Sequence, residues 1–128
     1  MADTETKVID ASALVALLFA EPSAPQVADK IRGCDLIAPA LLDFEVVNTC
    51  LSKMRRQPLL GEVLLDAYAV RSQIRIETME VDHTAVLALA QRTGLTGYDA
   101  NYLPLARTLS VELVTLDRKL AEAAEKFR

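Results

Sequence analysis

Four acidic residues are placed where they could do chemistry together, because each lies at the end of a predicted strand or near the start of a predicted helix. They are Asp10, Glu45, Asp99 and Asp117. Asp10 and Asp117 end two predicted strands, Glu45 falls near the start of a long helix, and Asp99 comes just before another helix. A hard dication such as Mg²⁺ prefers carboxylate oxygens as ligands. Without a cation, four such charges in one place would repel one another and raise some of the pKa values.

Each acid also has an ordinary structural explanation. Asp10, Asp99 and Asp117 suit the N-cap position of the helices that follow them, and Glu45 alone suits a solvated helix face. These explanations weaken together, since four independent caps or surface acids need not fall at one rim of one sheet. Two hydroxyl residues add to the pattern: Ser12 follows Asp10 by two positions, and Thr115 precedes Asp117 by two. If the strand persists, Thr115 and Asp117 face the same side.

Other catalytic groups are scarce in the sequence. The single histidine, His83, begins a helix after a different strand and is expected to be a surface or core residue. The two cysteines, Cys34 and Cys50, are expected to be reduced, and with one histidine they are too few for a structural zinc site. No nucleophile elbow, phosphate-binding loop or dinucleotide motif occurs. Carboxylates without histidine or cysteine indicate metal-assisted chemistry, in which the metal activates water.

The elements that must position the acids alternate between strands and helices. Strands are predicted over 7–10, 35–39, 76–81 and 112–116. Helices are predicted over 11–19, from Ser23 to just before Gly33, and over 41–56, 59–72, 83–92, 100–109 and 117–126. This alternation predicts an α/β fold with a parallel sheet flanked on both faces. Ligands of open α/β sheets bind at the carboxyl ends of the strands, which is where Asp10 and Asp117 stand.

The helix predicted over 41–56 is amphipathic. Its apolar stripe is formed by Phe44, Val47, Leu51 and Met54. A polar stripe beside it carries Glu45 and Asn48. In the later helix over 100–109, Pro104 lacks an N–H and is expected to kink the chain.

Length and charge restrict the class of protein. The chain has 128 residues, a net charge of −4 and an isoelectric point near 5.0, and we expect a single domain over residues 1–128. An acidic chain does not coat nucleic acid with a basic surface, although a nuclease that carries its own metal ions can be acidic. The longest apolar run near the N-terminus, 11–20, covers ten residues, and a membrane span needs about 20. We therefore expect a cytoplasmic protein.

Four blocks of the sequence resemble the PIN-domain ribonucleases, and most closely the VapC-type toxins of bacterial and archaeal toxin–antitoxin modules. The blocks are Val8-Ile-Asp10-Ala-Ser12-Ala, Glu45-Val-Val-Asn48, Tyr98-Asp99-Ala100-Asn-Tyr102-Leu and Val114-Thr115-Leu-Asp117. The resemblance covers 8–120. It implies a three-layer PIN-like domain with a short central parallel sheet of four to five strands flanked by helices. A final strand after Asp117 is left open, because the sequence ends soon afterwards.

The resemblance also implies an activity. It implies a Mg²⁺-dependent endoribonuclease, with Mn²⁺ as a possible substitute, that acts as the toxin of a type II toxin–antitoxin pair. It assigns the four acids to metal binding and catalysis, and Ser12 and Thr115 to hydrogen bonds that order the site. Asn48 matches a recurrent family position. The implied partners are an RNA substrate, a cognate antitoxin that covers the acidic groove, and a second copy in a homodimer.

Contacts with RNA and with partners are less clearly marked. The candidate RNA-binding cations are Lys53, Arg55, Arg56, Arg118 and Lys119, and they could equally be ordinary solvated charges. Apolar residues within 59–70 and 13–19 are candidates for a partner surface. The alternative function is a non-catalytic PIN-like module that binds RNA or protein, which a metal titration would distinguish. A phosphoacceptor receiver domain is disfavoured, because Asp117 stands where that class needs a lysine.

Overall fold

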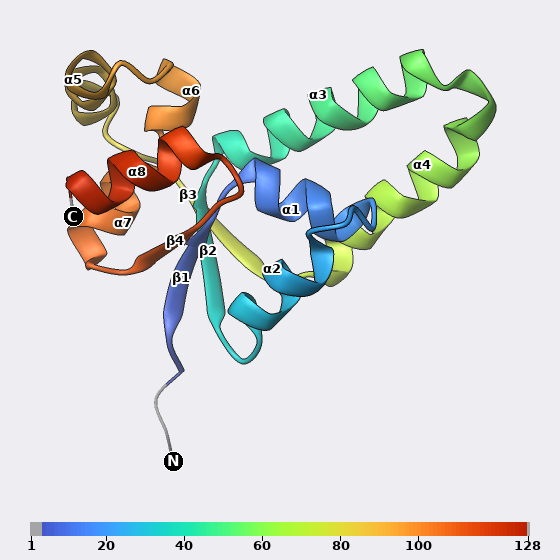
Figure 1. Cartoon of the computed structure of the whole chain (residues 1–128), viewed down its shortest axis with the longest axis horizontal. Helices are drawn as coiled ribbons and strands as arrows, with labels where there is room; N and C mark the ends of the chain where they lie inside the picture. Colours follow the sequence, from blue (N-terminus) through green and yellow to red (C-terminus); the bar gives the residue numbers. More distant parts are fainter. Residues whose placement is uncertain (1–3, 128) are drawn as a thin grey trace.

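A parallel four-stranded sheet runs through the middle of the structure, a computed structural model that describes residues 4–127 (Figure 1). The strands are β1 (Thr6–Ile9), β2 (Asp35–Pro39), β3 (Ile76–Met79) and β4 (Glu112–Val114). They lie in the order β3-β2-β1-β4, and every neighbouring pair is parallel. The expected α/β class is confirmed, with four strands among the described residues. The open question of a final strand is answered within 4–127, where the last element is a helix.

Two groups of helices enclose this sheet. The first group is α1 (Ala11–Leu18), α2 (Ala24–Ile31), α3 (Leu41–Arg56) and α4 (Gly61–Ala69). The second is α5 (His83–Thr93), α6 (Gly97–Ala100), α7 (Leu103–Leu109) and α8 (Arg118–Lys126). In Figure 1 the first group extends to the right of β1 and the second gathers to its left, so the domain has the expected helix–sheet–helix layers.

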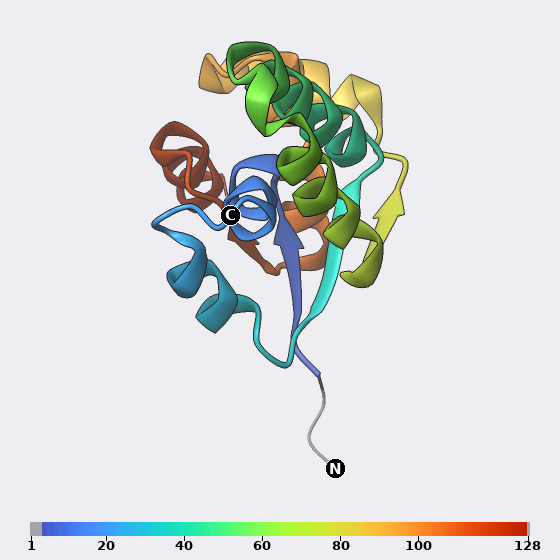
Figure 2. The same ribbon diagram turned by 90° about the vertical axis from the view of Figure 1, so that its right-hand side faces the viewer.

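Helices α3 and α4 form a hairpin that extends beyond the sheet, and Figure 2 shows them side by side. The short 3₁₀ segment η1 (Pro58–Leu60) joins them, and a second, η2 (Val70–Gln73), follows α4. The helix predicted over 59–72 is therefore divided into three pieces. At the base of the hairpin, the Arg71 guanidinium donates to both carboxylate oxygens of Asp43, with Nε 2.8 Å from Oδ1. This paired contact fixes the start of α3 relative to the end of the hairpin.

The apolar stripe predicted for α3 is not the stripe that packs on the core. Phe44 is 69% exposed and Val47 is 47% exposed, whereas Leu42 and Val46 are fully buried. The helix carries two apolar stripes, and the buried one includes Cys50 as its third member. Helical period alone gives both stripes and does not say which of them meets the sheet. The exposed stripe consequently leaves apolar surface beside the carboxyl edge of the sheet.

The segment predicted as one helix over 100–109 is also divided. Residues Gly97–Ala100 form the single turn α6, and α7 begins only at Leu103, with Pro104 in its first turn. Proline fits there because the N–H it lacks has no partner in a first turn. Asp99 therefore lies inside α6 and not, as expected, just before a helix.

The two candidate partner surfaces differ in exposure. Helix α1 is a core element: Ala13, Leu14 and Ala16 are fully buried, so the expectation of a partner surface over 13–19 is wrong. Leu59 is 100% exposed and Val63 is 64% exposed, so the hairpin does present apolar surface. Among the residues that the structure describes, no helix combines the length and hydrophobicity needed to cross a bilayer.

Candidate active site

All four predicted acids line one groove of about 730 Å³ at the carboxyl edge of the sheet. Asp10 directly follows β1, and Asp117 stands between β4 and α8. Glu45 comes from the second turn of α3, and Asp99 from α6. Four separate elements thus bring carboxylates to one place, as the rule for strand ends in parallel sheets predicts.

Asp10 is the most firmly held of the four. Its side chain is 4% exposed. Oδ1 accepts hydrogen bonds from the backbone N–H of Ala13 at 3.0 Å and from the Ser12 hydroxyl at 2.7 Å. Oδ2 accepts a short hydrogen bond from the Thr115 hydroxyl. The two hydroxyl residues therefore orient Asp10, and Thr115, which directly follows β4, ties it to the end of the neighbouring strand.

Two of the four acids are both helix N-caps and members of the shared groove. Asp10 is the N-cap of α1, and Asp117 is the N-cap of α8 through a 3.2 Å bond that its Oδ1 accepts from Leu120 N–H. Asp99 is not a cap: Thr96 caps α6 by accepting from the Asp99 N–H at 3.1 Å. Capping anchors the two aspartates at rigid helix ends while both still face the groove.

Glu45 has a partner that the sequence did not indicate. The Tyr102 hydroxyl donates to Glu45 Oε1 at 2.6 Å, and Tyr102 is only 1% exposed. Burial, reinforced by the carboxylate of Glu45, raises the pKa of the Tyr102 phenol, so the phenol keeps its proton and acts as the donor. In the sequence a tyrosine among apolar residues resembles an ordinary core residue, and no spacing rule relates position 102 to position 45.

Electrostatics in the groove favour a cation. Burial raises the pKa of Asp10, of Glu45 and of Asp99. Negative charge from another acid raises each of them further: Asp117 acts on Asp10 and on Asp99, and Asp99 acts on Glu45. Hydrogen bonds from Thr115 and Tyr102 oppose this by lowering the pKa of Asp10 and of Glu45 respectively. A dication placed between these carboxylates would relieve the repulsion.

The donor set fits Mg²⁺ or Mn²⁺. All the candidate ligands are carboxylate oxygens, which these ions prefer. Within residues 4–127, no three acidic, histidine or cysteine side chains lie close enough to enclose an ion by themselves. Mg²⁺ typically binds one or two carboxylates and keeps several water molecules, so it does not need a closed cage.

Replacing Asp99 by asparagine is expected to stabilise the metal-free protein modestly, as removal of an unfavourable charge commonly does. The reason is that partial burial, together with the nearby charge of Asp117, raises the pKa of Asp99. Urea unfolding in EDTA at neutral pH measures the change. Asp82→Asn is the matched control, since Asp82 caps α5 away from the groove and its replacement should give no gain. A loss of stability in Asp99→Asn would contradict the repulsion.

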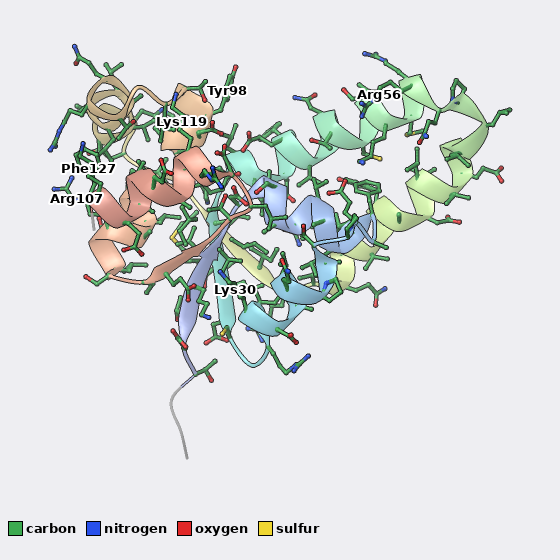
Figure 3. All side chains as sticks on the ribbon, viewed as in Figure 1. Lys30, Arg56, Tyr98, Arg107, Lys119 and Phe127 are labelled. Carbon is green, nitrogen blue, oxygen red and sulfur yellow. The ribbon has the colours of Figure 1, made fainter. Side chains whose placement is uncertain are left out.

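The remaining predicted residues are placed unevenly around the groove. Asn48 lines it, while His83 is exposed and lies outside it. Of the basic residues, Lys119 is close enough to Asp99 to lower its pKa, and Lys53 pairs at 3.1 Å with Glu21, which lines the groove. The other basic candidates are exposed and are not among the lining residues: Arg55, Arg56 and Arg118. Figure 3 shows Arg56 at the far end of α3, away from Tyr98 and Lys119.

Comparisons with known proteins agree on one family. The PIN domain family model matches residues 7–126. Ribonuclease VapC12 of Mycobacterium tuberculosis is 30% identical over 121 residues, covering 91% of this chain and 90% of that protein. Ribonuclease VapC3 of Pyrobaculum aerophilum is 33% identical over 126 residues, covering 90% and 92%. The crystal structure of PAE2754 from Pyrobaculum aerophilum matches with a TM-score of 0.75 and 28% identity, over 95% of this chain and 81% of that one.

Proposed function

The chain belongs to the PIN domain family, and on this premise we propose that it is a Mg²⁺-dependent endoribonuclease, the toxin of a type II toxin–antitoxin pair. The observation that carries the proposal is the single groove to which four separate elements contribute carboxylates. Relatives of similar length are named ribonuclease VapC, which supports RNA as the substrate. We propose Asp10, Glu45, Asp99 and Asp117 as the metal-binding and catalytic residues.

Each residue of the groove has a defined task in this proposal. Asp10 and Asp117 present carboxylates from rigid helix ends, while Glu45 and Asp99 face them from α3 and α6. A bound Mg²⁺ would supply an activated water and would stabilise negative charge on the scissile phosphate. Lys119, beside Asp99, is suited to contact a neighbouring phosphate of the RNA. Attack by water leaves the 2′-hydroxyl unused, so the products should carry a 5′-phosphate and a 3′-hydroxyl.

The experiment that tests this function is cleavage of total cellular RNA by the purified protein, with Mg²⁺ and with EDTA. The expected result is cleavage at a few discrete sites with Mg²⁺ and no cleavage with EDTA. The products should have 5′-phosphate ends that a ligase accepts without prior phosphorylation. Calorimetric titration with Mn²⁺ accompanies the assay. Absence of both cleavage and metal binding would contradict the proposal and favour the non-catalytic module.

A cognate antitoxin should cover the acidic groove with basic side chains, because charge complementarity selects such a partner. The α3–α4 hairpin offers an apolar surface that could receive the rest of that partner. Leu59 is fully exposed, Val63 is 64% exposed and Leu65 is 55% exposed. Large side chains exposed together in this way mark interaction surfaces.

We expect a homodimer that uses the exposed stripe of α3, defined by Phe44, Val47 and Leu51. Val47→Glu should weaken self-association more than tenfold, because a charge buried at an interface costs several kcal/mol without a partner. Sedimentation across a concentration series measures this. Leu109→Glu, at a 50% exposed position that ends α7, is the control and should leave the dimer intact. A Val47→Glu protein that dimerises like the parent would place the interface elsewhere.

A further inference from the structure

We propose that Tyr102 is a positioning residue of the groove, whose hydroxyl holds the Glu45 carboxylate in place for a metal ion. This inference rests on the proposed function, since it assigns a task in the same site. The primary observation is the 2.6 Å bond that Tyr102 Oη donates to Glu45 Oε1 across 57 residues of sequence. Glu45 has a long, flexible side chain on a helix, so a fixed donor is what converts it into an oriented ligand.

Tyr102 also connects Glu45 to the other acids. Its backbone N–H donates to the Asp99 carbonyl at 3.3 Å, so the residue that holds Glu45 also closes the turn that carries Asp99. Ala11, which follows Asp10 directly, lies near enough for its backbone N–H to lower the pKa of the phenol. Tyr102 therefore connects Glu45 to the segment of Asp99, through its hydroxyl to the first and through its backbone to the second. Tyr102 also lines the groove together with all three acids.

The hydroxyl is the part of Tyr102 that packing alone does not explain. The ring belongs to the hydrophobic core with Leu103 and Ala106, and phenylalanine would fill the same space. A buried phenol oxygen needs a polar partner, and here the partner is Glu45. No buried side-chain polar atom among the described residues lacks a hydrogen bond. The only polar atom of the Tyr102 side chain therefore binds a residue of the groove.

The test is the affinity for Mn²⁺ of Tyr102→Phe, measured by electron paramagnetic resonance or calorimetry without RNA. Removal of the hydroxyl should weaken binding about tenfold or more, the effect usual for groups that orient metal ligands. Tyr68→Phe is the matched control, because Tyr68 is half-buried against the core and does not line the groove, and it should bind as the parent does. In cleavage assays, the Mg²⁺ concentration for half-maximal rate should rise for Tyr102→Phe alone. Parental affinity in Tyr102→Phe would overturn the proposal.

A double-mutant cycle separates positioning from a general loss of packing. If Tyr102 acts through Glu45, Tyr102→Phe in a Glu45→Ala background should cause no further loss of Mn²⁺ affinity. An equal loss in both backgrounds would overturn the proposal. The same cycle, read by urea unfolding in EDTA, measures the Tyr102–Glu45 coupling without metal or RNA. The two claims can fail separately. If the parent protein neither bound metal nor cut RNA, the proposed function would be wrong, but the cycle would still show whether Tyr102 holds Glu45. A coupling energy of zero between Tyr102 and Glu45 would overturn the inference itself.

Discussion

Asp10→Asn is expected to lose RNA cleavage by about 10³-fold or more while remaining folded. The expected loss follows from the several kcal/mol that metal-assisted charge stabilisation supplies, at about 1.4 kcal/mol for each factor of ten in rate. Asparagine still offers one oxygen to Ala13 N–H and Ser12, and its amide can donate to Thr115. It is also as good an N-cap as aspartate. The fold should therefore stay within about 1 kcal/mol of the parent.

Asp82→Asn is the matched control for this experiment. Asp82 caps α5 through bonds from Thr84 N–H at 2.9 Å and Ala85 N–H at 3.4 Å, and it does not line the groove. Both variants keep a cap while losing a charge, but only Asp10 lines the groove. Cleavage by Asp82→Asn should match the parent. Equal cleavage by Asp10→Asn and the parent, with both proteins folded by circular dichroism, would remove Asp10 from the mechanism.

Withdrawal of divalent metal is expected to abolish cleavage, and addition of Mg²⁺ is expected to raise the melting temperature more at pH 8 than at pH 5. At ten times its dissociation constant, a ligand stabilises the folded state by about 1.4 kcal/mol, which is about 5 °C for a domain of this size. Differential scanning fluorimetry over a Mg²⁺ series at both pH values measures the shift. Equal ionic strength in NaCl controls for screening.

The sign of the pH effect follows from the three raised carboxyl pKa values. Because the pKa values of Asp10, Glu45 and Asp99 are higher in the folded than in the unfolded chain, the folded state holds more protons between those values. Stability from these groups is therefore complete below the ordinary carboxyl pKa and is lost as the pH rises through the raised values. Above that pH window the carboxylates of the metal-free groove are charged and repel one another, so a bound cation offsets the largest repulsion there. A larger Mg²⁺ shift at pH 5 would contradict this account.

The sequence was informative where position in the chain determines position in space. Asp10 and Asp117 follow parallel strands, so the strand pattern alone places them at one edge of the sheet. Thr115 is two residues before Asp117, and its hydroxyl accepts from the Asp117 backbone N–H, but the carboxylate to which it donates is that of Asp10. The rule predicts which edge a residue occupies, and it does not predict which of two carboxylates a hydroxyl will meet.

Features that depend on packing between distant segments could not be predicted from the sequence. The exposed and buried stripes of α3 have the same helical period, and only contact with other elements decides between them. The Tyr102–Glu45 bond joins residues 57 positions apart, so no local pattern carries it. A kink was expected at Pro104, but Pro104 lies in the first turn of α7, and the chain divides before it. The separate turn α6 around Asp99 depends on the Thr96 cap and was not expected.

The two capping aspartates have a consequence for how this protein can change over generations. Asparagine and serine start a helix about as well as aspartate does, so the requirement for a stable fold does not distinguish them at positions 10 and 117. A single nucleotide change converts an aspartate codon to an asparagine codon. If cleavage of RNA were no longer required, such substitutions would therefore give proteins that are folded but inactive. The need for a stable helix start therefore does not by itself keep an acid at either position.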